Sequence, residues 1–178
     1  CIRDRSGKDL SYNNYNDIFA GLDILFSEKK TPSTVIIKHA NPCGVASNRS
    51  SFKSFISARA SDPVSAFGGV VACNYKINSK IASEINKTFF EVILAKGFDK
   101  KALQMLKKKK NMRVIDISKV SYKSDTTTKI FDNSFLLQEK DELVFERKKL
   151  KFVTKNKPTK NEIKNIEFAF RICKYVKS

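Results

Sequence analysis

Histidine and paired cysteines are scarce in this 178-residue chain, and their scarcity excludes several kinds of site. The chain has one histidine and four cysteines, and no two cysteines form a CxxC pair. The clustered ligands of a structural zinc site are therefore missing. We expect all four thiols to be free, as in proteins of a reducing compartment. The cysteines are Cys1, Cys43, Cys73 and Cys173.

Long apolar runs and targeting signals are also missing. The longest apolar stretches, such as residues 34–37 and 67–73, fall far short of the roughly 20 residues that cross a bilayer. The first residues show no signal-peptide pattern. Hydrophobic residues make up 41% of the chain and charged residues 30%, which is ordinary for one globular domain with a core. We expect a soluble, cytoplasmic domain that makes no membrane contact.

Positive charge is abundant, and it invites a nucleic-acid interpretation. The net charge is +17, from 35 Lys and Arg against 18 Asp and Glu. Only seven of the basic residues are arginine, the residue favoured for bidentate contacts to guanine, and the lysines are spread along the chain. A basic nucleic-acid-binding module therefore stays an alternative, for which affinity should fall steeply with salt. Any anionic ligand would be attracted by the same field.

Strand and helix patterns alternate along most of the chain. Buried strands are expected near residues 35–37, 70–73, 92–95 and 112–117, and weaker ones near 135–138 and 143–145. Helices are expected over 18–26, 51–60, 79–87 and 99–107, with Asn16 and Asp17 capping the first and Ser79 the third. Thr159 and Glu162 form a capping box for a last helix that continues to the chain's end. This alternation predicts an α/β layered sheet with flanking helices.

Two polar loops beside buried strands could carry chemistry. Residues 38–44 and 62–69 are expected beyond the carboxyl ends of strands, where open α/β sheets bind ligands. The first loop places the single histidine, His39, beside Lys38. A neutral imidazole can accept a proton near pH 7, and an adjacent ammonium can stabilise developing negative charge. Taken alone, however, a lone histidine at a strand end is more often a structural or surface residue.

The motif at residues 38–44, K-H-A-N-P-C-G, resembles the K-H-x-N-P-C-G motif of AICAR transformylase. That family is the formyltransferase half of the bifunctional AICAR transformylase/IMP cyclohydrolase. Further stretches resemble the family in the same order, and together they cover nearly everything from residue 7 to residue 178. They are L-S-Y-N-N-x-N-D at 10–17, D-P-V-S-A-F-G-G at 62–69, F-E-V-I-L-A at 90–95, K-K-K-K-N-M-R at 107–113 and V-T-K-x-K-P-T at 153–159.

The resemblance implies a reaction and a set of roles. His39 would accept the proton of the AICAR amine as it attacks 10-formyltetrahydrofolate, and Lys38 would stabilise the transition state. Gly68 and Glu91 would contact the ribonucleotide, although some members carry Asp at the position of Glu91. Asn14 would lie near the nucleotide, and Asn41 inside the first motif is a further candidate for binding it. The folate is a co-substrate, and no tightly bound cofactor is implied.

The resemblance also implies a cytidine-deaminase-like fold without its zinc. Zinc deaminases need H-x-E and P-C-x-x-C, whereas here His39 is followed by Ala-Asn and the Pro-Cys pair by Gly-Val-Ala. We therefore expect no metal at the site. An interaction scaffold that kept this fold is a second alternative, against which the intact Lys38 and His39 argue.

By the same resemblance, residues 7–178 would be the N-terminal part of the transformylase domain, and residues 1–6 fit the family poorly. A cyclohydrolase domain and an Arg-Tyr-Gly stretch would precede this chain. A catalytic Asn would follow Ser178, and then the second half of the transformylase domain. The family's active sites form across a homodimer. We therefore expect little or no activity from the 178 residues alone.

Overall fold

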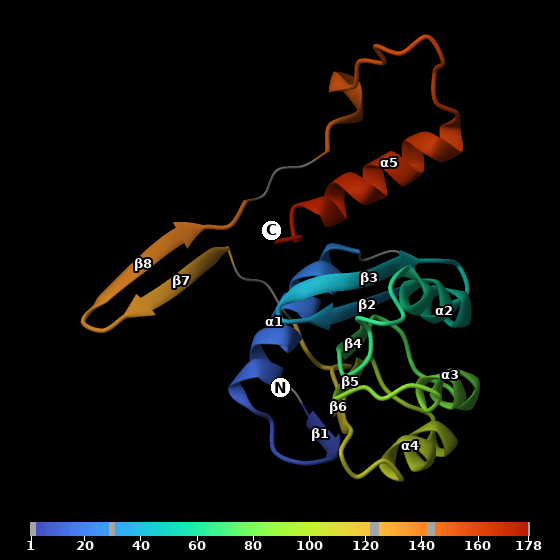
Figure 1. Cartoon of the computed structure of the whole chain (residues 1–178), viewed down its shortest axis with the longest axis vertical. Coiled ribbons are helices and arrows are strands. Elements are labelled where there is room, and N and C mark those ends of the chain that lie inside the picture. Colours follow the sequence, from blue (N-terminus) through green and yellow to red (C-terminus); the bar gives the residue numbers. More distant parts are fainter. Residues whose placement is uncertain (1–2, 29–30, 122–124, 142–144, 178) are drawn as a thin grey trace. The chain divides into compact units, whose positions relative to one another are not determined.

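The computed structural model describes residues 3–28, 31–121, 125–141 and 145–177 (Figure 1). The chain divides into two compact units. The first holds residues 1–121 together with 175–178, and the second holds residues 122–174.

A six-stranded mixed sheet forms the centre of the first unit, in the order β1-β6-β5-β4-β2-β3. Strands β4 (Val70–Cys73), β5 (Val92–Ala95) and β6 (Arg113–Asp116) run parallel to one another. Strand β2 (Ser33–Lys38) runs antiparallel to β4. The four strands expected in this part of the chain are confirmed, and so is the α/β architecture with a mixed sheet between helices.

The two outer strands of this sheet were not expected. Strand β1 (Arg3–Ser6) pairs antiparallel with β6, and β3 (Asn41–Ser47) pairs antiparallel with β2. Residues 38–44 were expected to form a loop because they contain proline and glycine, which are uncommon inside strands. Gly44 is required there, because a side chain at this position would overlap the carbonyl of Ala58 in α2 (Ser51–Ser61).

Helices cover both faces of the sheet (Figure 1). Helices α2, α3 (Ser79–Ile85) and α4 (Lys100–Lys107) share one apolar core with the sheet, in which Ile36, Val71 and Ile93 are fully buried. Helix α1 (Tyr12–Ser27) packs on the opposite face, where its Gly21 lies against Ile37 and Ala72.

The N-caps of two helices differ from the expectation. Helix α1 begins six residues before the expected start at residue 18, because Ser11 caps it and Asn14 closes a capping box with Ser11. Asn16 and Asp17 are therefore inside the helix and do not cap it. Asn78 rather than Ser79 caps α3, by accepting a hydrogen bond from the Ile81 N–H.

The second unit contains a hairpin, a short 3-10 turn and a helix. Strand β8 (Ser134–Glu139) confirms the strand expected near 135–138, and it pairs with the unexpected β7 (Thr126–Phe131). The strand expected at 143–145 falls mostly outside the described residues, and Phe145 is not part of a strand. The 3-10 turn η1 spans Arg147–Lys149. Every described residue of the hairpin is exposed, including apolar Ile130, Phe135 and Leu136.

Helix α5 (Lys160–Cys173) begins at the predicted capping box, with the Thr159 N–H donating to the Glu162 carboxylate at 2.6 Å. It ends at Cys173, so the expectation that the helix continues to residue 178 is wrong. Among the helices of the described residues, none has both the length and the apolar character needed to span a bilayer.

Candidate active site

The two polar loops meet at one end of the sheet, where strands β2 and β4 lie side by side. Lys38 is the last residue of β2, while residues 62–69 lead into the first residue of β4. They meet because β2 and β4 are antiparallel, with Ile37 opposite Val70. The loop 62–69 therefore lies at an amino end, and the expectation that both loops follow carboxyl ends is wrong. The parallel strands β5 and β6 begin at this same end of the sheet.

A hydrogen bond from Lys38 connects these loops directly. Its ammonium Nζ donates to the carbonyl oxygen of Phe67 at 2.7 Å. An ammonium has three donors, so this bond leaves further capacity for a ligand. The Phe67 ring is exposed and packs against the Phe89 ring with centroids 5.7 Å apart. Lys38 thus lies where two loops and an aromatic pair meet.

His39 and Ala40 form the two-residue turn between β2 and β3. Lys38 pairs with Asn41 across this turn, and His39 and Ala40 have φ angles of 55° and 57°. Two consecutive residues with positive φ are typical of a type I′ hairpin turn, for which Asn-Gly is the favoured sequence. A left-handed conformation costs a residue with a side chain about 1–2 kcal/mol. Backbone strain of this kind gathers at functional sites. The His39 side chain is exposed, and Ala40 is buried.

A carboxylate from α1 holds the turn. Asp17 Oδ1 accepts a hydrogen bond from the Ala40 N–H at 2.6 Å. The pattern of the sequence assigned Asp17 to a helix cap and gave no sign of this contact, which joins residues 23 positions apart.

Three of the expected nucleotide-binding residues, Asn14, Gly68 and Glu91, lie at this end of the sheet. The Asn14 side-chain amide donates to Glu91 Oε2 at 2.7 Å, which brings together two candidates 77 residues apart. Glu91 comes just before β5 and keeps 43% of its side chain exposed. The Gly68 N–H donates to the Phe89 carbonyl at 2.8 Å, and its φ of 74° lies in the left-handed region that favours glycine.

Arg113, which sequence reasoning missed, also faces Glu91. Its guanidinium lies 4.0 Å from the Glu91 carboxylate and donates two hydrogen bonds to the Asp9 carbonyl. Arg113 is the last residue of the K-K-K-K-N-M-R motif, so its place in that motif could have marked it as a site residue. A cation thus lies beside the Asn14–Glu91 pair.

Asn41 contacts the chain's C-terminal residues. Its Nδ2 donates to the Lys177 carbonyl at 3.2 Å, and its Oδ1 accepts from the Lys177 N–H at 2.9 Å. This two-bond pairing fastens the segment after α5 to the first unit, of which residues 175–178 are part. Each polar atom of the Asn41 side chain thus makes one hydrogen bond to Lys177.

Cys43 and Asp62 complete the neighbourhood of Lys38. Burial, followed by the negative charge of Asp62, raises the pKa of the Cys43 thiol, so the thiol stays protonated and poorly nucleophilic at neutral pH. Hydrogen bonds from the side chain and backbone N–H of Ser65 hold the pKa of Asp62 below its usual range. Asp62 is therefore ionised and closes the turn that starts its loop.

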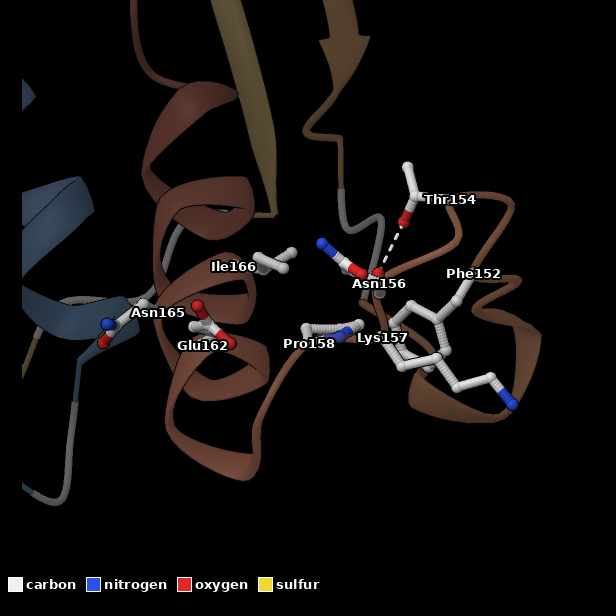
Figure 2. A pocket seen from close by; sticks show the side chains of 8 residues that line it. All are labelled: Phe152, Thr154, Asn156, Lys157, Pro158, Glu162, Asn165 and Ile166. Carbon is white, nitrogen blue, oxygen red and sulfur yellow. Dashed lines mark hydrogen bonds between the residues drawn. The ribbon is translucent and has the colours of Figure 1, made fainter.

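Other parts of the described structure offer weaker sites. In the described ranges no three His, Cys, Asp or Glu side chains are grouped as metal ligands. An open pocket of about 490 Å³ lies in the second unit, where the 152–158 loop faces α5 (Figure 2). Figure 2 shows Phe152 and Lys157 on the loop side and Glu162 and Ile166 on the helix side. None of the expected site residues lines it.

Comparison with known proteins gives one consistent match. A model of the AICARFT/IMPCHase bienzyme family matches residues 2–178. The bifunctional purine biosynthesis protein PurH of Thermoanaerobacter sp. (strain X514) is 42% identical over 172 residues, which are 97% of this chain and 34% of that protein. The proteins of the same name from Acetivibrio thermocellus and Nostoc punctiforme are 41% and 40% identical, again over 97% of this chain and 34% of their own length.

Proposed function

This chain belongs to the AICARFT/IMPCHase bienzyme family, and we propose that it supplies the Lys38–His39 part of a formyl-transfer site in purine biosynthesis. The reaction would move the formyl group of 10-formyltetrahydrofolate to the amine of AICAR. The whole protein would also carry an IMP cyclohydrolase activity outside these residues. The observation that supports the proposal is the strained turn at His39, which lies at the same end of the sheet as Gly68 and the Asn14–Glu91 pair and follows Lys38, the residue that donates to the Phe67 carbonyl.

In the proposed reaction, the amine nitrogen bonds to the formyl carbon, and the bond from that carbon to N10 of the folate breaks. The amine is a weak nucleophile because its lone pair is delocalised into the imidazole ring. His39 takes the amine proton as the new bond forms, and a proton ends on the leaving N10. Lys38 stabilises the negative charge that develops on the formyl oxygen. Its ammonium can do so while one of its donors holds the Phe67 carbonyl.

The nucleotide would lie along the starts of β4, β5 and β6. The carboxylate of Glu91 has acceptor capacity beyond the bond from Asn14 and can receive a hydrogen bond from a ribose hydroxyl or an amine. Gly68 lacks a side chain, and apart from its two chain neighbours no group of the described residues lies within 4 Å of the position where a Cβ would be. A substrate can therefore approach the backbone there. The net charge of +17 suits an anionic nucleotide and an anionic folate.

We also propose the finer features that the family resemblance implies. These are the cytidine-deaminase-like arrangement of the mixed sheet, a site without resident metal or tightly bound cofactor, and a homodimeric whole protein. The exposed Ile130, Phe135 and Leu136 of the β7–β8 hairpin support self-association, because a lone two-stranded hairpin is marginally stable in water.

The test is a formyl-transfer assay on the full-length protein that contains this sequence, with AICAR and 10-formyltetrahydrofolate. Production of formyl-AICAR that depends on both Lys38 and His39 is the expected result. A full-length protein that binds neither substrate, or that turns them over equally well without His39, would contradict the proposal.

A further inference from the structure

Asp17 has no part in the reaction described above, yet it touches the turn that carries His39. It lies in the second turn of α1, half-buried, and its Oδ1 accepts the Ala40 N–H at 2.6 Å. A hydrogen bond from a backbone N–H to an ionised carboxylate is stronger than a bond between neutral groups. This bond thus links α1 to the turn between β2 and β3.

The turn needs such a restraint because its sequence does not favour its conformation. His39 and Ala40 both lie in the left-handed region, with φ angles of 55° and 57°. Turns of this kind are usually built from Asn and Gly, which enter that region at little cost. Neither residue of this turn is a glycine, so a contact outside the turn must offset the conformational cost.

The bond acts on the peptide group between His39 and Ala40. Fixing the Ala40 N–H fixes the plane of that peptide, and with it the backbone on both sides. The direction in which the His39 side chain leaves the turn depends on this backbone. Lys38 precedes the turn directly and donates to the Phe67 carbonyl, so a change in the turn would also reach that contact.

We propose that Asp17 is a positioning residue, which holds the His39–Ala40 turn in its left-handed conformation so that the Lys38–His39 pair is aligned for catalysis. This inference rests on the proposed function for its kinetic part. The restraint itself is a property of the fold and can be measured without substrate.

The experiment compares four variants of the full-length protein. Asp17→Ala removes the acceptor, and Asp17→Asn keeps an acceptor oxygen without the charge. Asp17→Ala with Ala40→Gly removes the acceptor but lets the turn residue enter the left-handed region freely. Asp17→Ala with Asp132→Gly is the matched control, because Asp132 also has a positive φ, 43°, but lies in the β7–β8 turn. Circular dichroism verifies that each variant is folded.

Two readouts are taken. Hydrogen exchange of the backbone amides of residues 38–41 reports on the turn without any substrate, and Asp17→Ala should accelerate it. Steady-state kinetics should show kcat falling by roughly 10- to 100-fold, since small misplacements of a catalytic group cost rates of this order, while KM for AICAR changes by less than about threefold. Ala40→Gly should restore slow exchange and most of kcat, Asp132→Gly should restore neither, and Asp17→Asn should lie between Asp17→Ala and the unmodified protein.

Unchanged exchange in Asp17→Ala would overturn the proposal, as would faster exchange with an unchanged kcat. Equal rescue by Asp132→Gly would also overturn it, because a general gain in stability would then explain the recovery. If no variant, nor the unmodified protein, transfers formyl groups while the exchange pattern appears as described, the proposed reaction fails and the restraint by Asp17 stands.

Discussion

The Lys38 ammonium donates to the Phe67 carbonyl at 2.7 Å, and this bond ties the end of β2 to the loop that enters β4. A structural tether and a proposed charge stabiliser are therefore the same side chain. Separating the two roles requires substitutions that treat charge and hydrogen bonding differently.

Replacing Lys38 in the full-length protein should affect catalysis more than binding. Lys38→Met removes the cation, and we expect kcat for formyl transfer to fall by about 10²- to 10³-fold, the range for losing one group that stabilises an oxyanion. Lys38→Arg keeps the charge and should lose less. Lys53→Met, an exposed lysine of α2, is the control and should leave kcat unchanged. Equal losses for Lys38→Met and Lys53→Met would rule out a specific role for Lys38.

Replacing His39 removes the proposed proton acceptor. We expect His39→Ala to lower turnover by roughly 100-fold or more, the range for losing a general base. The KM for AICAR should change little, because His39 acts on the amine during its attack and adds little to ground-state binding. Initial rates with both substrates varied would measure this. An unchanged rate would remove His39 from the mechanism.

The Asn14–Glu91 pair should control nucleotide affinity. Glu91→Ala and Asn14→Ala should each raise the KM for AICAR by about tenfold or more with a smaller change in kcat. The two residues share a 2.7 Å hydrogen bond, so their effects should not add. A double-mutant cycle should give a coupling free energy of about 1.5–3 kcal/mol, the range for a hydrogen bond to a charged group. Glu91→Asp should be tolerated better than Glu91→Ala, and additive effects would contradict a coupled pair.

The Asn41–Lys177 pairing should restrain the segment that follows α5. Asn41→Leu removes two hydrogen bonds worth about 0.5–1.5 kcal/mol each, so opening of residues 175–177 should become roughly 5- to 160-fold more frequent. Hydrogen exchange of that segment measures it. Asn41→Asp keeps the acceptor for the Lys177 N–H and should show a smaller effect. Identical exchange in all three proteins would mean that the pairing does not restrain the segment in solution.

The Arg5–Asp116 pair should make the free energy of unfolding depend on pH. Burial opposes ionisation of Asp116, but hydrogen bonds from Arg5 and Ser118 outweigh it and lower the pKa of Asp116 to about 2. A carboxyl group with a lowered folded pKa stabilises the fold above its unfolded pKa of about 3.9, and this contribution is lost as the pH falls toward 2.

Asp116→Asn should therefore lower the free energy of unfolding at pH 7 by roughly 1–2 kcal/mol, allowing for solvent screening at the partly exposed Arg5. The difference from the unmodified protein should shrink between about pH 5 and pH 2. Denaturant unfolding at several pH values measures it, with Asp4→Asn on the exposed side of β1 as the control. A difference that stays constant with pH would contradict the assignment to Asp116 ionisation.

Local patterns predicted the elements whose apolar residues repeat regularly. Residues 35–37 and 92–95 are apolar throughout, and both are buried strands in the sheet. The capping box of Thr159 and Glu162 marked the start of α5 correctly because both halves of that signal lie within four residues. Signals of this kind depend only on neighbours in the sequence.

Features that depend on distant pairing could not be predicted in this way. The turn at His39 and Ala40 lacks the Asn-Gly signal, so strand β3 after it read as a loop. Loops 38–44 and 62–69 meet because β2 runs antiparallel to β4, a strand direction that periodicity does not reveal. The contact of Asp17 with Ala40 follows from the placement of α1 on the sheet, and no sequence pattern near either residue predicts it.

The edge strand β1 has a consequence for synthesis on the ribosome. Arg5 and Asp116 are 111 residues apart, so β1 cannot join the sheet until β6 has emerged. At about 5–20 residues per second, translation of that interval takes roughly 6–20 s. During this delay β1 lacks its partner strand, and its unpaired backbone N–H and C=O groups are open to other chains. We therefore expect β1 to be the last strand to join the six-stranded sheet during synthesis, ahead only of the later pairing of Lys177 with Asn41. A molecular chaperone that binds the unpaired β1 would protect the chain during this delay.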